Sequence, residues 1–170
     1  MFSNGKPGMP GSRDSRIFVV GVGNLVRSDD GLGIHALRRL QADPRVPRSV
    51  VLMDGGTVGL ELFSYVCDAS RLLLIDAVNV AEPPGTLIRL QDAEIRRLRG
   101  GGSVHHLGVA DLVASLSLVG KDSLQIMLLG AQPESTEWGT GLTPGVEAAL
   151  GPLVEAAISI LENWTREMAA

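Results

Sequence analysis

The sequence is short of several features, and each shortage excludes a class of protein. Its 170 residues include one cysteine, Cys67, so an internal disulfide is excluded. No apolar run approaches the roughly 18 residues of a membrane span. The formal net charge of −4 argues against a broad nucleic-acid-binding surface. We therefore expect a soluble cytoplasmic monomer that binds neither nucleic acid nor a membrane.

The composition and length are those of one globular domain. Hydrophobic residues make up 45% of the chain and charged residues 20%, which suffices for a buried core. Residues 1–15 are rich in Gly, Pro and Ser and have no apolar stretch, which predicts a disordered tail rather than a signal peptide. We expect a single α/β domain over 16–168.

Hydrophobic patterning predicts the order of helices and strands. Continuous apolar runs, typical of buried strands, cover 16–23, 50–54, 71–78, 86–91 and 124–131. Helical patterns cover 31–42, 57–67 (with Thr57 as N-cap), 107–119 and a final region opened by Thr143 and Pro144, which Gly151 and Pro152 kink or restart. The first three strands alternate with helices, so they favour a parallel sheet.

One connection breaks this alternation. Residues 79–85 are too few to hold a crossover helix, so strand 86–91 is predicted to run antiparallel to strand 71–78. The predicted fold is a three-layer α/β/α sandwich around a five-stranded, mostly parallel sheet with one antiparallel strand.

Acidic residues follow the first three predicted strands. Asp29 and Asp30 lie in "GVGNLVRSDDGLGI" (21–34), Asp54 ends the second strand and Asp76 ends the third. A single Asp in such a place commonly caps the next helix, but ligands of open α/β sheets bind beyond the carboxyl ends of the strands. Gathered carboxylates repel one another unless a cation or proton lies between them. The acids therefore predict a cation site or an acid/base site.

The chain offers three histidines as softer ligands. His35 falls on the polar face of a predicted helix, which favours a surface role, whereas His105 and His106 follow the glycine-rich loop 99–103. Two carboxylates with one imidazole suit a divalent transition metal that keeps open positions. Magnesium or calcium would need no imidazole.

Two other chemistries have weaker support. A nucleotide site would use "GVGNLV", but Val26 stands where the third glycine of GxGxxG belongs, and Asp29 and Asp30 would repel a pyrophosphate. Asp54 would then imitate a ribose ligand. A covalent nucleophile is disfavoured, because Cys67 lies in an apolar helical pattern that predicts a buried thiol, and no serine occupies a G-x-S-x-G turn.

Ordered blocks along residues 16–165 resemble the hydrogenase maturation endopeptidases, peptidase family M52. The blocks are "GVGNLVRSDDGLGI", "DGGTVGLELF", "LLLIDAV" with "PPGTLIRL", "HHLGVADLV", and "QPES" followed by "GLTPGVEAAL". The resemblance implies a protease that removes the C-terminal extension of a nickel–iron hydrogenase large-subunit precursor after nickel insertion. A nickel-checking chaperone that binds the precursor without cutting it is the alternative.

The resemblance also implies a set of site residues. The metal contacts fall on Asp30, Asp76 and His105, with His106 one residue away. The family often has Glu where Asp30 stands, and Asp54 matches a further acid whose role is less settled. The implied nickel comes with the precursor rather than being tightly resident. It either polarises the scissile carbonyl and activates a water, or serves for docking while Asp54 or Asp76 acts as general base. Asp30, Asp54 and Asp76 are thus the candidate catalytic residues.

Overall fold

The computed structural model describes most of the chain after residue 15. The described residues are 16–56, 63–97, 109, 112–113, 115–121 and 124–170. Several predictions fall outside them: the tail 1–15, the N-cap Thr57, the loop 99–103, and His105 and His106.

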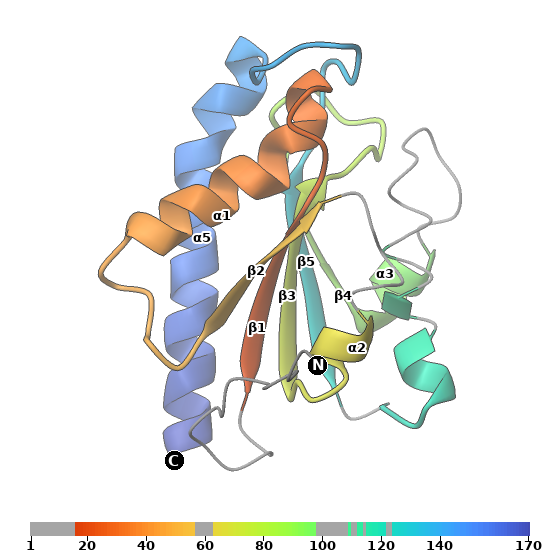
Figure 1. Cartoon of the computed structure of the whole chain (residues 1–170). Coiled ribbons are helices and arrows are strands. Elements are labelled where there is room, and N and C mark those ends of the chain that lie inside the picture. The colour runs from red at the N-terminus through yellow and green to blue at the C-terminus, as the bar shows by residue number, and fades with distance from the viewer. Residues whose placement is uncertain (1–15, 57–62, 98–108, 110–111, 114, 122–123) are drawn as a thin grey trace, which may run out of the picture.

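The described residues form one five-stranded sheet, whose strands are β1 (Ile17–Val22), β2 (Val51–Gly56), β3 (Arg71–Ala77), β4 (Leu87–Gln91) and β5 (Gln125–Ala131). The strand order is β2-β1-β3-β5-β4 (Figure 1). β1, β2, β3 and β5 run parallel, and β4 pairs antiparallel with β5. The predicted sheet and its single antiparallel strand are confirmed. β5 lies between β3 and β4, although it comes last in the chain.

Burial of the strands follows their place in the sheet. Every residue of β1 is buried, and so is every residue of β3 after Arg71. Both strands are flanked by neighbours and covered on both faces, which is why their sequences are continuously apolar. β2 and β4 lie at the two edges and are partly exposed.

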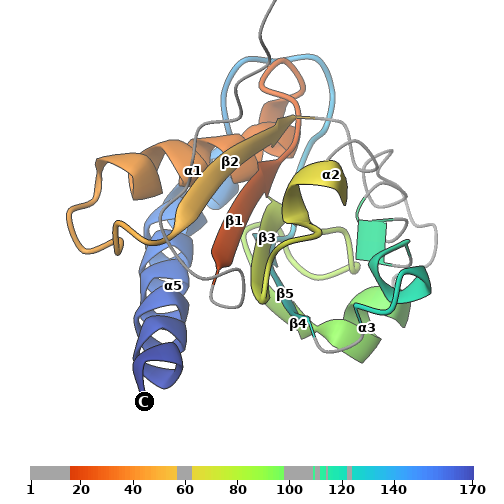
Figure 2. The ribbon, with the colours of Figure 1, turned by 60° about the horizontal axis from the view of Figure 1, so that its bottom comes forward.

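Helices cover both faces of the sheet. They are the 3-10 turn η1 (Ser28–Gly31), α1 (Leu32–Ala42), α2 (Phe63–Val66), α3 (Asp92–Arg97) and α5 (Pro144–Ala169), with further helical residues at 109, 112–113 and 115–118. Figure 2 shows α1 and α5 on one side of the sheet and α2 and α3 on the other. The arrangement confirms the three-layer sandwich.

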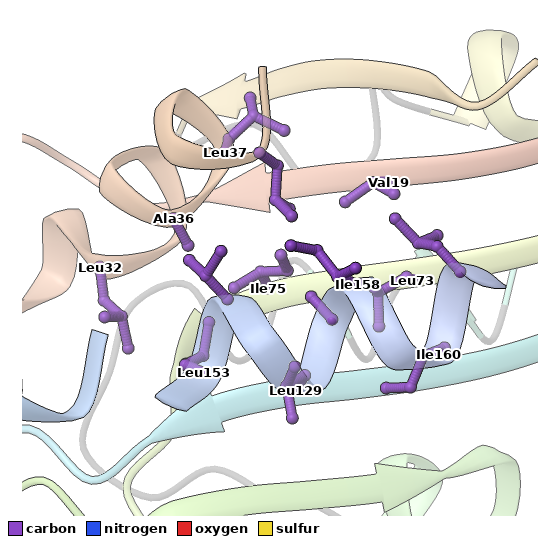
Figure 3. Close-up of a cluster of buried hydrophobic side chains, with 14 of the residues drawn as sticks. Val19, Leu32, Ala36, Leu37, Leu73, Ile75, Leu129, Leu153, Ile158 and Ile160 are labelled. Atoms are coloured by element: carbon purple, nitrogen blue, oxygen red, sulfur yellow. The ribbon is translucent and has the colours of Figure 1, made fainter. Parts of the chain in front are cut away.

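Two hydrophobic cores result from the alternation of side chains along the strands. Val19, Leu73, Ile75 and Leu129 meet α1 and α5 on one face, as Figure 3 shows. On the other face Val20, Leu74 and Leu128 meet side chains of the 109–116 segment. Asp76 alternates with Ile75 and Ala77 of the first core, so it lies on the face of Leu74 and Val78.

The helix α3 was not predicted, although the sequence carries a signal for it. The Glu94 carboxylate (Oε2) accepts a hydrogen bond from the Gln91 amide at 2.9 Å, as in the second half of a capping box. Asp92 Oδ1 accepts from the Ile126 amide at 3.1 Å and so ties the start of α3 to β5.

Of the kink or restart predicted at Gly151 and Pro152, the restart is wrong. α5 runs unbroken from Pro144 to Ala169 with Pro152 inside it. Pro152 is exposed, while Leu150 and Leu153 beside it are buried in the core. Packing of the apolar face therefore outweighs the one backbone hydrogen bond that a proline removes. α5 also has the length and hydropathy of a membrane span, but its apolar side chains pack in the core, which accounts for its composition.

Candidate active site

The glycine turn after β1 lets α1 approach the sheet closely. A Cβ on Gly21 would lie 2.4 Å from the carbonyl oxygen of Gly33, so no other residue fits at position 21 without a shift of the helix. The Gly23 amide, just beyond β1, donates to the Gly56 carbonyl at 2.7 Å. The turn thus holds the ends of β1 and β2 together and delivers the chain into η1, which carries the two adjacent acids.

Asp30 and Asp76 are buried carboxylates on elements that contact each other. Asp30 lies in η1 with 3% of its surface exposed, and Asp76 lies near the end of β3 with 0% exposed. η1 packs against β3. Asp76 Oδ1 accepts a hydrogen bond from the Ala77 amide at 2.8 Å. Burying carboxylates is costly unless a cation, a proton or hydrogen bonds compensate the charge. Two buried carboxylates on contacting elements are therefore candidates for a functional site.

Asp54 lies apart from this pair. It is exposed on the edge strand β2, and its Oδ1 accepts a hydrogen bond from the Gly56 amide at 2.9 Å. Asp54 pairs with Gly21 of β1, and Gly21 pairs on its other side with Ile75 of β3. Two strand spacings, about 10 Å, therefore separate the backbone of Asp54 from that of β3. Asp54 shares the carboxyl edge of the sheet with Asp30 and Asp76 without belonging to the buried pair.

Asp29 has a structural role that the sequence did not reveal. Its side chain is fully buried and accepts four hydrogen bonds. Oδ2 accepts from the amides of Glu134 (2.9 Å) and Ser135 (3.0 Å) and from the Thr143 hydroxyl (2.9 Å), and Oδ1 accepts from the Thr143 amide (2.6 Å). Successive side chains of a 3-10 turn point about 120° apart. Asp29 and Asp30 therefore face different partners, and only Asp30 belongs to the candidate site.

Thr143 is the N-cap residue of α5, as predicted, but its hydroxyl does not cap the helix. The hydroxyl donates to Asp29 instead, so α5 begins where the loop after β5 is tied to the turn after β1.

Gln132 is a second buried polar residue that the sequence did not single out. Its Oε1 accepts from the amides of Val80 (2.9 Å) and Glu82 (3.3 Å), and its Nε2 donates to Asn79 Oδ1 (3.1 Å). These bonds tie the loop after β3 to the end of β5. Asp29 and Gln132 together fix the loops that surround Asp30 and Asp76.

Two residues considered as alternatives have ordinary surroundings. His35 is half-buried on α1, where burial and then the nearby Arg38 lower the pKa of its imidazole. Cys67 is half-buried rather than buried as predicted, because it lies just beyond the short α2, and its thiol donates to the Ser64 carbonyl at 3.4 Å. These contacts are typical of structural side chains.

The described residues supply only carboxylates to the candidate metal site. Across these residues, no group of three or more His, Cys, Asp or Glu side chains is placed to hold a metal ion. The predicted imidazole ligand, His105, lies outside them, as does His106. Asp30 and Asp76 are hard oxygen donors, and they fit a divalent cation as part of a larger ligand set.

Comparison with known proteins decides the family. A model of the hydrogenase maturation proteases matches residues 34–160, a range that includes Asp54 and Asp76. The chain belongs to the hydrogenase maturation protease family. Membership of this family makes the chain a protease. The same finding removes the support for the nucleotide-binding alternative.

Relatives of the protease match most of the chain. The chain is 36% identical to the hydrogenase 2 maturation protease of Escherichia coli over 150 residues, which are 87% of this chain and 92% of that protein. It is 35% identical to the hydrogenase expression/formation protein HupD of Bradyrhizobium diazoefficiens, over 90% of this chain and 81% of that one. The solved structure of the hydrogenase maturating endopeptidase HybD from E. coli superimposes with a TM-score of 0.82 at 35% identity, covering 87% and 93% of the two chains. The resemblance found in the sequence is confirmed.

Proposed function

We propose that this protease removes the C-terminal extension of a nickel–iron hydrogenase large-subunit precursor after nickel has been inserted. Membership of the family supports the reaction and the kind of substrate. The observation that supports the location of the site is the buried pair Asp30 and Asp76, on the contacting elements η1 and β3. The pair lies at the carboxyl edge of the sheet, where open α/β folds bind their ligands.

Nickel in this proposal is part of the substrate. A cation brought by the precursor would offset the mutual repulsion of the two buried carboxylates and so favour docking of the loaded precursor. A resident zinc site takes three protein ligands, each oriented by further hydrogen bonds. The described residues offer only two carboxylates, fewer than such a site needs, and in this proposal His105 contacts the nickel only when the precursor brings it. Cleavage should then depend on nickel in the precursor.

Hydrolysis needs a water activated next to the scissile carbonyl. The water oxygen bonds to the carbonyl carbon, the C–N bond breaks, and the proton taken from the water passes to the leaving amine. Asp76 and Asp54 are the candidate general bases, because carboxylates can accept and return that proton. The two differ in position: Asp76 lies in the buried pair, whereas Asp54 is exposed two strands away.

The test compares nickel-loaded and nickel-free precursor, with the products weighed by mass spectrometry. We expect loss of the extension from the loaded precursor only. Asp30→Asn and Asp76→Asn should abolish cleavage, because the amide keeps the shape of the side chain and removes its charge. Asp68→Asn is the matched control. Asp68 is exposed and precedes β3, so it lies at the amino ends of the parallel strands, whereas Asp76 lies at their carboxyl ends.

The chaperone alternative gives a different result in the same experiment. An intact precursor in a stable complex with the wild-type protein would support the chaperone and overturn the proposed cleavage. Normal cleavage by Asp30→Asn would overturn the proposed site. We also propose that the protease acts in the cytoplasm as a monomer, and sedimentation of the purified protein tests the latter.

A further inference from the structure

A tryptophan projects into solvent beside the candidate active site. The Trp138 side chain is 76% exposed, and Val26, on the facing loop, is 46% exposed. Such exposure is unusual for tryptophan, whose large apolar ring is mostly buried in folded proteins. We name the Trp138 patch as the side chains of Val26, Arg27 and Trp138.

Arg27 braces the exposed ring from one side. Its guanidinium carbon lies 5.6 Å from the centre of the Trp138 ring, within the range of a cation–π contact. Its Nε donates to the Thr136 carbonyl at 3.0 Å, so the guanidinium is itself held in place. The ring therefore has a supported face and remains largely open to a partner.

The two loops that carry the patch are fastened to each other along their length. The Ser28 amide donates to the Gly139 carbonyl at 2.8 Å, and the Gly139 amide donates to the Val26 carbonyl at 3.1 Å. A Cβ at position 139 would lie 2.4 Å from the Ser28 hydroxyl oxygen, so a larger residue there would force the Ser28 side chain to move. The Asp29 side chain adds four hydrogen bonds between the same two loops. Figures 1 and 2 both show the loop after β5 beside the loop after β1.

This fastening makes the patch a pre-organised surface. Ordering a mobile loop on binding costs conformational entropy, and a loop that is already held in place avoids that cost. Tryptophan and arginine are also the residues most enriched among those that dominate binding energy at interfaces. An exposed tryptophan on a rigid support has the properties of a binding residue.

The patch lies close to the candidate active site along the chain. The Asp30 amide donates to the Arg27 carbonyl at 3.1 Å, so the patch begins one turn of chain before the buried carboxylate. At the 2.0 Å rise of a 3-10 helix, Arg27 and Asp30 are about 6 Å apart along the axis. A polypeptide that reaches Asp30 passes the patch within a few residues.

The size of the patch argues for a peptide segment rather than a second copy of the chain. One tryptophan buries about 150–250 Å², and its two smaller neighbours leave the patch well below the about 800 Å² per partner of a stable protein interface. It is large enough to hold one apolar side chain of an extended segment.

We propose that the Trp138 patch binds an apolar or aromatic side chain of the hydrogenase precursor, next to the segment that is cleaved. This inference rests on the proposed function. The patch contributes to affinity for the precursor and not to the chemical step, because its side chains lie outside the carboxylate pair.

Steady-state cleavage of nickel-loaded precursor by Trp138→Ala tests the patch. We expect KM to rise about tenfold or more, equivalent to about 1.4 kcal/mol of binding, while kcat stays within about twofold. Trp138→Phe keeps a ring and should give an intermediate KM. Leu118→Ala is the matched control. Leu118 is an apolar side chain with 87% exposure, and it precedes β5, so it lies at the amino ends of the parallel strands, away from Trp138. It should leave KM and kcat unchanged.

A binding measurement separates docking from cleavage. The chain has two tryptophans, and Trp164 is only 4% exposed in the core. With 5-fluorotryptophan in the protease alone, fluorine NMR should show precursor shifting or broadening the Trp138 resonance and leaving the Trp164 resonance in place.

Each outcome decides between the two proposals. Cleavage by wild type with an unchanged KM in Trp138→Ala overturns the patch and leaves the proposed function standing. A Trp138 resonance that changes with protease concentration before precursor is added assigns the patch to self-association and also overturns it. Failure of the wild-type protein to cut loaded precursor overturns the proposed function instead.

Discussion

Replacing Asp29 tests whether it fastens the loops rather than taking part in the chemistry. The carboxylate accepts four hydrogen bonds from three residues: Glu134, Ser135 and Thr143. In Asp29→Asn, the remaining carbonyl oxygen can accept from about two donors, and the new NH₂ group points at the others.

The expected loss follows from these bonds. A hydrogen bond to a charged group contributes about 1.5–3 kcal/mol, so losing two lowers the free energy of unfolding by about 3–6 kcal/mol, with the smaller value if the loop relaxes. For a chain of this size, 3 kcal/mol corresponds to a fall in Tm of about 6–12 °C. Asp54→Asn is the control, because Asp54 is exposed and accepts one local bond; its Tm should change by about 2 °C or less.

Urea unfolding at 25 °C measures the loss, with the midpoint lowered and the m-value unchanged. Hydrogen exchange locates it: the amides of Glu134, Ser135 and Thr143 should lose protection, and those of β3 should not. In a double-mutant cycle, Thr143→Val should cost less in the Asp29→Asn background than in the wild type.

A Tm within about 2 °C of wild type would refute this account of Asp29, since two buried hydrogen bonds to a charged group cannot be lost at so small a cost. A normal Tm together with lost cleavage would move Asp29 into the catalytic site. We expect the opposite order: Asp29→Asn loses stability first, and its cleavage at low temperature is reduced but not abolished.

Three further predictions concern the rest of the fold. Leu161→Ala removes a fully buried side chain from the core beneath α5, and should lower the free energy of unfolding by about 2–5 kcal/mol in urea. His35 has a lowered pKa in the fold, so the unfolded chain takes up a proton first as pH falls below about 6.5. Wild-type stability relative to His35→Gln should therefore decrease from pH 7.5 downwards and level off below the folded pKa; a constant difference would contradict it. Arg45 contacts Asp43 and Glu155 on the surface and lowers the pKa of both carboxyls. Arg45→Gln should change Tm by about 2 °C or less at neutral pH, and that small difference should disappear as pH falls through the lowered pKa values of the two carboxyls.

The sequence alone determined the strands and most of the topology. The runs that form β1, β3 and β5 are continuously apolar because these strands are covered on both faces. Such a run can be recognised in the sequence without knowledge of the fold. The short connection 79–85 determined the direction of β4, since seven residues cannot carry a parallel crossover. The sequence also placed Asp30, Asp54 and Asp76 at one edge of the sheet, because parallel strands bring their carboxyl ends together.

Only the tertiary structure decided which acids meet. Asp29 and Asp30 are neighbours in sequence, but the 3-10 turn directs them apart, and the donors of Asp29 come from residues more than a hundred positions later. Asp54 is separated from Asp76 because β1 lies between β2 and β3, which no local pattern encodes. Pro152 stays inside α5 because the packing on either side of it outweighs a local preference. In each case the deciding contact is made between distant segments, and such contacts exist only after the chain has folded.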